Sequence, residues 1–481
     1  MRCAGYDDYV AVDVLLVNLH SVRNKWVLHP PLGLAYLASS LEREGFVVQI
    51  LDANCPPERP GPLLLREIER IQPAIVGMTL FTPDLGTFGA LLPGLKELRR
   101  RGVYEHLVLG GHHPSYHPEI IEEIGCSWGV MWDGEVAFTQ LVTALLRGGR
   151  DPRDIDGVIS VRDGSSRINA HRLTPDLNDL PRPARHLLDN DAYFNPMSSQ
   201  KISSLIMARG CPFTCSFCSG ATETSKLSMR YRHVDSVLAE LREIKEVYGV
   251  DYVEFVDETF TLNKRLVHDV CEGMKGMGLK WGCQTRADVV DADLLKVMGE
   301  AGCDKIAFGI DASTERVRMS VAGKRISDQL FRDSFRWARD AGIKSVANII
   351  FGFPGERPYE AYRTLSLVKS LDPTFANFQP LYIYPATEIY DQAIAEGKID
   401  PGYWSRMVHE QLDMVPIYEQ PEYGMSTHRL KGFGRSFIWR FYLRPHQIGR
   451  LLERDRSPRD ILNYARIAAG MYRYYFQEAA A

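Results

Sequence analysis

The sequence of 481 residues has no apolar run that approaches the roughly 18 to 20 residues needed to span a membrane. Its first twenty residues carry one arginine and three aspartates around a short apolar stretch, and no small-residue cleavage site follows, so a signal peptide is not expected. No stripe of lysine and arginine runs through the bulk of the chain and the net charge is -4, so no nucleic acid partner is expected. These absences predict a cytoplasmic protein.

Cysteine is scarce and mostly scattered. Six of the nine cysteines stand alone, as reduced core or loop thiols do: Cys3, Cys55, Cys126, Cys271, Cys283 and Cys303. The other three, Cys211, Cys215 and Cys218, lie together on one short segment. Any cysteine chemistry in this chain is therefore expected at that segment.

What the chain does contain is the composition of a globular protein, with 45% apolar and 25% charged residues. At this length about three units are expected, on a prior of ~150 residues each. The pattern of elements predicts a front domain over 1–150, a mostly irregular linker over 151–200, a second domain over 201–400 and a mainly helical region over 401–481. The fold class is therefore α/β.

In the front domain, apolar β-rich runs alternate with amphipathic helical stretches. The runs lie at 12–19, 46–52, 74–80, 106–111 and 127–135. This alternation predicts a doubly wound, Rossmann-like parallel sheet, whose ligands sit beyond the carboxyl ends of the strands. Three segments follow those ends, at 79–83, 110–115 and 133–135.

The second domain repeats the alternation. Its expected strands lie at 203–209, 251–258, 279–286, 305–311, 344–353 and 375–384. Six consecutive βα units predict a partial TIM barrel, (β/α)6, with its active site at the carboxyl ends of the strands.

The three clustered cysteines lie directly after the first strand of this second domain, in the sequence RGCPFTCSFCS from Arg209 to Ser219. Three thiolates with C-x3-C-x2-C spacing can hold an iron-sulfur cluster or zinc, because soft sulfur ligands select both. A structural zinc site would need a fourth ligand, and the nearest candidate, His233, lies beyond a predicted turn. Three ligands leave one metal position open for a substrate.

This loop resembles the signature of the radical S-adenosylmethionine (SAM) superfamily. The resemblance implies a 4Fe-4S cluster on Cys211, Cys215 and Cys218, with SAM chelating the fourth iron. Reduction then cleaves SAM to a 5'-deoxyadenosyl radical. Phe217 matches the family's aromatic position beside the adenine. The alternatives are a zinc loop or three unrelated thiols.

Polar residues at the ends of the later barrel strands are candidates for holding SAM, because they are all expected at the barrel mouth. They are Asp257, Glu258, Gln284, Arg286, Asp311, Ser313 and Asn348. The stretch FGFPGE at 351–356, with Gly352 and Pro354, resembles the family's Gly-Pro-Gly-Glu turn, where small residues let the backbone approach SAM. Asp311 stands where many relatives have a glutamate, which leaves its role open.

The front domain together with this barrel resembles the cobalamin-dependent radical SAM enzymes, so a cobalamin is expected on the strand ends. The matching residues are Thr79, Pro83, Gly110, Gly111, His112, Pro114, Ser115 and Glu135. The Asp-x-His-x-x-Gly motif that supplies an axial histidine in cobalamin mutases is absent, so no histidine ligation is expected, from His112 or from His113. The alternative is a scaffold that binds no corrin.

The C-terminal region is aromatic and basic, with nine arginines against four acidic residues from Arg435 onward and the stretch FIWRFYLRP at 437–445. These aromatics either pack on the barrel or form an amphipathic face toward a membrane or a bulky anionic substrate. The ending resembles those of relatives that act on hydrophobic substrates, such as the anaerobic magnesium-protoporphyrin ester cyclase and hopanoid-modifying enzymes.

The resemblance implies methylation of an unactivated carbon in a small-molecule or lipid-like substrate. The deoxyadenosyl radical would remove a hydrogen and methylcobalamin would donate the methyl group. An electron donor such as a flavodoxin or ferredoxin is implied, and peripheral membrane contact through the C-terminal region is a further expectation. Oxidative cyclisation or rearrangement without methyl transfer is one alternative, and a non-catalytic cobalamin or iron-sulfur sensor is another.

Overall fold

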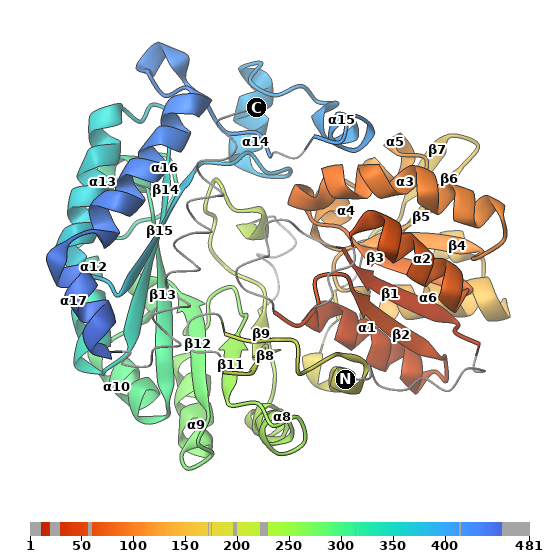
Figure 1. Ribbon diagram of the computed structural model, residues 1–481, viewed down its shortest axis with the longest axis horizontal. Helices are drawn as coiled ribbons and strands as arrows, with labels where there is room; N and C mark the ends of the chain where they lie inside the picture. The colour runs from red at the N-terminus through yellow and green to blue at the C-terminus, as the bar shows by residue number, and fades with distance from the viewer. Residues whose placement is uncertain are drawn as a thin grey trace. The chain divides into compact units, whose positions relative to one another are not determined.

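The computed structural model describes residues 11–19, 29–55, 60–171, 173–174, 176–195, 200–221, 229–312, 314–412 and 415–454 (Figure 1). The chain divides into two compact units. The front unit combines residues 1–193 with residues 399–415, and the barrel unit combines residues 194–398 with residues 416–481. The region after residue 400 is therefore shared between the two units.

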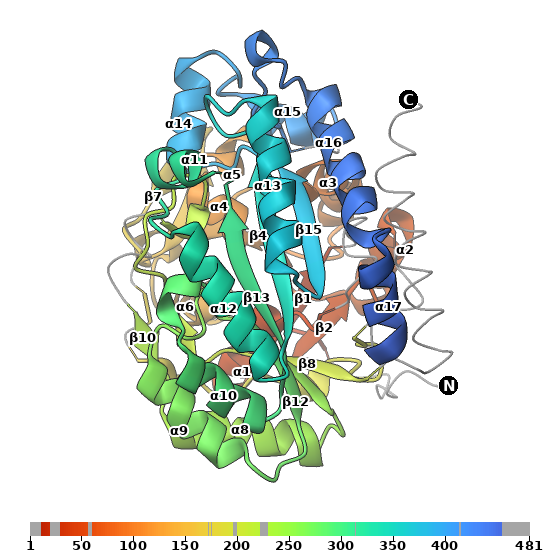
Figure 2. The same ribbon diagram turned by 90° about the vertical axis from the view of Figure 1, so that its left-hand side faces the viewer.

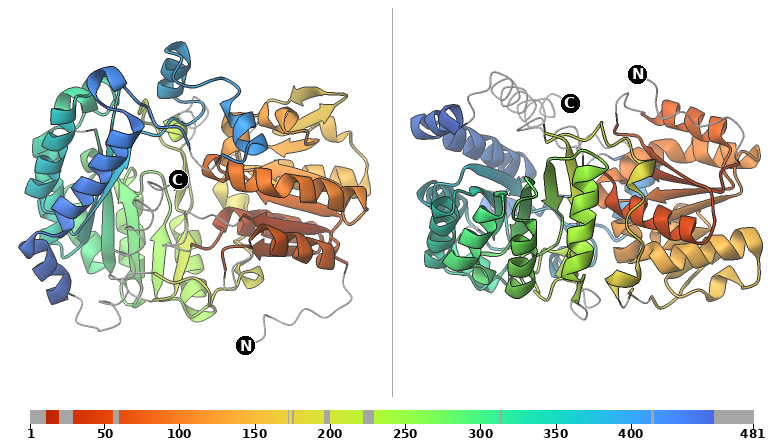
Figure 3. Two further views of the ribbon diagram at one scale, coloured as in Figure 1. Left: turned by 45° about the horizontal axis from the view of Figure 1, so that its top comes forward. Right: turned by 90° about the horizontal axis from the view of Figure 1, so that it is seen from below.

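The front unit is built on a parallel sheet with strand order β2-β1-β3-β4-β5. Its strands are β1 (Val14–Asn18), β2 (Val48–Asp52), β3 (Ile75–Thr79), β4 (His106–Gly110) and β5 (Trp128–Val130). Helices α1 (Leu32–Arg43) and α6 (Gly134–Arg147) cover one face, and α2 (Gly61–Ile71) and α3 (Leu85–Arg100) cover the other (Figure 3). Helices on both faces explain why most residues of these strands are apolar.

Two strands extend this sheet where the sequence analysis predicts an irregular linker. They are β6 (Val158–Arg162) and β7 (Ser165–Ile168), which pair antiparallel to each other and to β5. Asp163 and Gly164 connect them, and both have positive φ, at 53° and 74°. Asp-Gly is the residue pair that favours a two-residue hairpin turn of this kind.

The barrel unit contains a six-stranded parallel sheet in the order β15-β14-β13-β12-β11-β8, so within this sheet each strand lies beside the strand that precedes it (Figure 1). Helices cover the face of the sheet that is turned to the viewer in Figure 2. The strands are β8 (Ile202–Leu205), β11 (Tyr252–Phe255), β12 (Lys280–Thr285), β13 (Cys303–Asp311), β14 (Lys344–Phe351) and β15 (Phe375–Pro380). Within the described strands β8 and β15 are the two free edges, so the barrel is partial. The predicted fold class is confirmed for both sheets.

One face of the barrel sheet is covered by helices through alternate apolar residues, such as Phe255, Trp281 and Phe308. The covering helices are α8 (Val234–Glu246), α9 (Lys264–Met274), α10 (Ala292–Glu300), α12 (Asp328–Asp340) and α13 (Pro358–Leu371). The opposite face carries exposed side chains, including Gln284 of β12 and Val256 at the end of β11, although neither strand is at an edge of the sheet. That second face is therefore the one open to ligands.

The C-terminal region contributes helices to both units. Helix α14 (Glu388–Ala395), α16 (Thr427–Tyr442) and α17 (Pro445–Arg454) belong to the barrel unit, and α15 (Tyr403–His409) belongs to the front unit. Phe433, Phe437 and Phe441 of α16 are buried in the core of the barrel unit, which favours the packing interpretation of the aromatic stretch. No helix in the described part of the chain is long and apolar enough to cross a membrane.

Helix α15 packs closely on α3 within the front unit. Trp404, Met407 and Val408 are at most 1% exposed. Gly89 of α3 meets the backbone of Val408, because a Cβ placed on Gly89 would lie only 1.9 Å from the Val408 carbonyl oxygen. Only glycine fits at this crossing.

Candidate active site

The cysteine loop follows β9 (Ala208–Arg209) and is fixed at its centre by Ser216. The Ser216 N–H donates to the Ala322 carbonyl at 3.3 Å and its hydroxyl donates to the Val321 carbonyl at 2.7 Å. Its own carbonyl accepts from the N–H of Ile389 at 3.1 Å. These bonds hold the loop from two sides.

The three thiols of this loop form no disulfide. Cys218 is exposed, and Cys211 and Cys215 are partly exposed. Burial raises the pKa of the Cys215 thiol, and the nearby positive charges of Lys324 and Arg286 oppose that rise. Soft sulfur donors beside cations fit an iron-sulfur cluster, whose thiolates need compensating charge. In the part of the chain that the structure describes, no group of three His, Cys, Asp or Glu side chains lies close enough together to hold a single metal ion.

Arg286, predicted at the barrel mouth, lies against the cysteine loop. Its Nη1 is 3.5 Å from the Cys215 sulfur, and its guanidinium carbon is 3.6 Å from the centre of the Phe213 ring. Asp288 holds the other side of the guanidinium, with Nε to Oδ1 at 2.9 Å and Nη2 to Oδ2 at 2.7 Å. The side chain is therefore locked in a position where it supports the loop by charge and by cation–π contact.

Asp257 holds the strand that leads into the loop. Its Oδ1 accepts hydrogen bonds from the N–H groups of Met207 at 3.1 Å and Ala208 at 2.6 Å. The residue is 2% exposed, and burial raises its pKa to about 7. Glu258 beside it is exposed, and Gln284 Nε2 is 3.4 Å from the Asp257 carbonyl. The Asp257 carboxyl group therefore binds the protein backbone.

Asp311 ends β13 in a left-handed conformation, with φ of 56°, at an irregularity in the pairing with β14. Its Oδ2 lies 2.6 Å from Lys324 Nζ, which also donates to the Gly309 carbonyl. The lysine is 3% exposed, so this is a buried, neutralised pair. Ser313, predicted with Asp311, lies outside the described residues.

Asn348 lies on the open face of the barrel sheet. Its Oδ1 accepts a hydrogen bond from Nδ2 of Asn377, its register partner on β15, at 2.9 Å. The structure thus brings a pair of amides to the ligand side of the sheet, next to the turn that follows β14.

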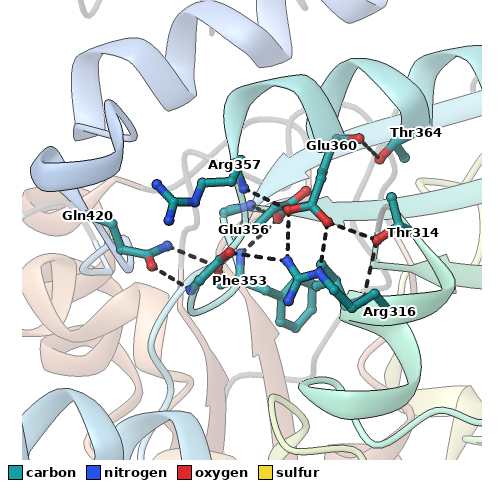
Figure 4. A network of polar contacts seen from close by, with 11 residues as sticks. Thr314, Arg316, Phe353, Glu356, Arg357, Glu360, Thr364 and Gln420 are labelled. Carbon is teal, nitrogen blue, oxygen red and sulfur yellow. Dashed lines mark hydrogen bonds and ion pairs between the residues drawn. The ribbon is translucent and has the colours of Figure 1, made fainter.

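That turn, at 352–356, packs against the cysteine loop through Phe353, whose ring meets the Phe217 ring edge-on at 5.5 Å. Glu356 Oε2 accepts from the N–H groups of Gly352 at 2.6 Å and Phe353 at 2.9 Å. Figure 4 shows the polar network around the turn, in which Arg316 also reaches the Gly355 carbonyl at 3.1 Å. The turn containing Gly352 and Pro354 is therefore held by its own glutamate and by residues outside it.

Three residues of that network were not predicted from the sequence: Arg316, Glu360 and Gln420. Arg316 Nη2 and Glu360 Oε2 are 2.7 Å apart. Glu360 also accepts from the N–H of Arg357 at 3.0 Å, which caps α13. The one sequence signal was the glutamate at the third position of that helix, as in a capping box.

In the front unit, the loop after β4 is built around Gly111, which has φ of 95°. A Cβ at Gly111 would lie 2.6 Å from Thr79 Oγ1, so the two loops approach at backbone distance. Ser115 ties this loop to the next one, because its hydroxyl donates to the Gly111 carbonyl at 2.8 Å and accepts from the Trp132 N–H at 2.7 Å. Close backbone approach at the carboxyl ends of the strands fits a cofactor cradle.

The two histidines of this loop differ in environment. His113 is fully buried, its Nδ1 is 3.0 Å from Thr82 Oγ1, and its ring meets Trp404 of α15 edge-on. Burial lowers the pKa of His113 well below its usual value, so this imidazole is neutral. Its Nε2 has no hydrogen-bond partner among the described residues. His112 is exposed and lies beside Phe81.

The exposed His112 belongs to a row of rings along the strand ends. Neighbouring ring centres are 5.0 to 5.9 Å apart, in the order Phe81, His112, Tyr116, Trp132 and His171. Pro83 and Pro114 stiffen the loops that carry these rings, and Glu135 is buried at the start of α6. A surface of rings fits the flat, largely apolar face of a corrin.

Comparison with known proteins identifies the class. The radical SAM superfamily profile matches residues 205–368, and the B12 binding domain profile matches residues 24–142. The chain is 30% identical over 456 residues to an uncharacterised methyltransferase from Pyrococcus horikoshii, which covers 93% of this chain and 94% of the relative. It is 26% identical over 394 residues to the anaerobic magnesium-protoporphyrin IX monomethyl ester cyclase of Rubrivivax gelatinosus, covering 78% and 68% of the two chains.

The fold agrees with a solved member of the same class. The radical SAM methyltransferase TsrM from Kitasatospora setae, with cobalamin and a 4Fe-4S cluster bound, superposes with a TM-score of 0.66 at 21% identity, over 82% of this chain and 77% of that one. The chain belongs to the cobalamin-dependent radical SAM enzymes. The predictions of the enzyme class and of its cofactors, a 4Fe-4S cluster, SAM and cobalamin, are confirmed at the level of the family.

Proposed function

We propose that this enzyme methylates an unactivated carbon of a small-molecule or lipid-like substrate. One observation carries the proposal: a single chain holds an anchored loop of three thiols that form no disulfide and a separate glycine cradle lined with rings. Similarity to a relative named as a methyltransferase extends over nearly the whole chain. Both features are what a reaction with two cofactors requires.

The protein's own part in the reaction is to hold and shield. When bound, the reduced cluster with SAM supplies hydrogen-atom abstraction, and cobalamin supplies the methyl group. Ser216 and Asp257 fix the loop that would carry the cluster, and Arg286 places positive charge beside it. Preorganised groups of this kind lower the cost of binding and orientation.

The remaining site predictions belong to this proposal. Cys211, Cys215 and Cys218 would hold the cluster, the turn with Gly352 and Pro354 would face SAM, and the loops around Thr79 and Gly111 would face the corrin. Asp257, Arg286 and Asp311 act on SAM only through the backbone and the loop, because their charged groups are already engaged within the protein.

Oxidative cyclisation is a second candidate, because several relatives are named as magnesium-protoporphyrin ester cyclases. The two reactions are distinguished by the fate of the SAM methyl group. SAM with a deuterated methyl group would be supplied to the enzyme in a cell extract. Methylation predicts products that gain the whole deuterated methyl group, and cyclisation predicts products that gain none.

The catalytic claim is tested first without a substrate. The full chain would be reconstituted anaerobically with iron and sulfide, and 5'-deoxyadenosine would be measured after addition of SAM and dithionite. Wild type should form it and Cys215→Ala should not. Absence of product with wild type, or equal product with the variant, contradicts the proposal.

Cobalamin binding is tested at Gly111. Gly111→Val introduces a Cβ at 2.6 Å from Thr79 Oγ1, so cobalamin retention measured by absorbance should fall. Gly102→Val is the matched control, because Gly102 also has positive φ, at 76°, but a Cβ there meets nothing within 4 Å. Equal retention in Gly111→Val and the control would remove the glycine cradle from the proposal.

Two partners complete the proposal. One is a one-electron donor such as a flavodoxin or ferredoxin, because cluster reduction needs an external electron. The other is a membrane surface for the C-terminal region, where Leu443 and Ile448 are 59% and 41% exposed. Co-sedimentation with anionic vesicles tests the second, and Leu443→Gln should weaken it.

A further inference from the structure

We propose that Gln420 is a positioning residue for SAM, which acts by fixing the turn at 352–356. The inference rests on the proposed function, in which that turn faces SAM. Gln420 lies on the segment by which the chain re-enters the barrel unit after residue 415. It belongs to no motif in the sequence.

Both ends of the Gln420 amide bind the backbone of the turn (Figure 4). Oε1 accepts a hydrogen bond from the Gly355 N–H at 2.6 Å, and Nε2 donates to the Phe353 carbonyl at 2.9 Å. Gln420 is 3% exposed, so these bonds are shielded from water. One side chain therefore satisfies a donor and an acceptor two residues apart and sets the direction of the peptide groups between them.

The turn needs an external partner to keep one conformation. Gly352 and Gly355 have φ of 94° and 69°. Glycine adopts positive and negative φ with similar ease, so these two residues do not by themselves fix the conformation of the turn. Glu356 fixes the N–H groups of Gly352 and Phe353 at the start of the turn. At the second glycine, Arg316 holds the Gly355 carbonyl and Gln420 holds the Gly355 N–H.

Gln420 is itself held in place before any ligand binds. Its N–H donates to the Met425 carbonyl at 2.9 Å, and its carbonyl accepts from the Met425 N–H at 3.0 Å. Met425 is fully buried. The backbone is thus fixed by Met425 and the side chain by the turn, so little conformational entropy is left to lose when SAM binds.

A shift of the turn would reach the cysteine loop. Phe353, whose carbonyl is held by Gln420, packs its ring against Phe217, the residue before Cys218. The turn also lies close to α16, because a Cβ at Gly352 would lie 3.0 Å from the Leu430 side chain. Loss of Gln420 is therefore expected to loosen the turn beside the cysteine loop.

The test compares SAM affinity in the full, reconstituted chain. Gln420→Leu keeps the size of the side chain and removes both hydrogen bonds. We expect the Kd for SAM to rise about tenfold, equivalent to ~1.4 kcal/mol, with iron content equal to wild type. Gln392→Leu is the matched control, because Gln392 is exposed on α14 and, among the described residues, its side chain hydrogen-bonds only to Glu396. The change that SAM causes in the EPR spectrum of the reduced cluster should also be altered in Gln420→Leu alone.

Gln420→Glu separates positioning from folding. A glutamate still accepts from Gly355, but its ionised carboxylate faces the Phe353 carbonyl and cannot donate to it. In this variant alone, SAM affinity should recover as the pH falls and the carboxyl is protonated. This readout decides the matter if Gln420→Leu does not hold the cluster.

An unchanged Kd in Gln420→Leu, within twofold of wild type with full iron content, would overturn the inference. So would a pH profile of Gln420→Glu that matches wild type. Failure of the proposed function has a different signature, because wild type itself would then bind no SAM and form no 5'-deoxyadenosine.

Discussion

Replacement of Gly89 by alanine should release helix α15 from the front unit. The added Cβ would meet the Val408 carbonyl oxygen at 1.9 Å, and an ordinary contact begins at 3.4 Å, so α15 must move by about 1.5 Å. Overpacking of this kind costs ~1–3 kcal/mol. Alanine also favours helix α3 by up to ~1 kcal/mol, which makes it easier for the strain to be relieved by movement of α15 than by distortion of α3.

Hydrogen exchange followed by mass spectrometry measures this release directly. The peptide that contains residues 403–409 should exchange about 5- to 150-fold faster in Gly89→Ala, since 1.4 kcal/mol corresponds to a factor of ten. Gly33→Ala on α1 is the matched control, because a Cβ there meets nothing within 4 Å. Wild-type exchange of α15 in Gly89→Ala would refute the claim that this crossing admits only glycine.

Three further outcomes are expected. Arg286→Met removes the guanidinium beside Cys215, a charge-assisted contact worth ~1.5–3 kcal/mol, so iron content after reconstitution should fall, and an unchanged iron content would contradict this. Asp257 has its pKa raised to about 7, so the stability it contributes is present at low pH and is lost as the pH rises from about 4 through 7. Asp257→Asn keeps an acceptor for the Ala208 N–H, so the Tm of this variant minus the Tm of wild type should increase from pH 5 to pH 8. A Tm difference that does not vary with pH would contradict this. Gly164→Ala should lower the free energy of unfolding by ~1–2 kcal/mol, because φ is 74° and the added Cβ meets no atom within 4 Å, so backbone strain acts alone. An unshifted midpoint in a denaturant titration would argue against the hairpin turn.

The fold was largely predictable because the barrel sheet and the first five strands of the front sheet are parallel. Their strands read as apolar runs and the helices between them as amphipathic stretches, and the order of these elements predicts the two architectures. The β6–β7 hairpin was missed because its second strand is mostly exposed and carries no apolar run. The Asp163-Gly164 pair was the available signal.

The site was predictable only as far as local spacing reaches. Three cysteines within one loop predict the cluster position, and they lie within the residues that the radical SAM profile matches. Their role as cluster ligands stays a prediction. Asp257 and Asp311 were predicted from their positions at strand ends, but a sequence does not show that backbone amides and Lys324 already engage their carboxylates. Their cofactor roles stay predictions. Gln420 was not predictable, since it meets Gly355 across 65 residues of sequence and no pattern connects the two.

The return of residues 399–415 to the front unit means that this B12-binding unit is not a portable module. The polypeptide passes between the two units three times, after residues 193, 398 and 415. A gene fragment that ends at residue 193 would omit Trp404, Met407 and Val408 and would leave the Gly89 surface of α3 uncovered. Exchange of the front unit between enzymes of this class, whether by recombination or by design, must therefore transfer a second, distant stretch of coding sequence with it.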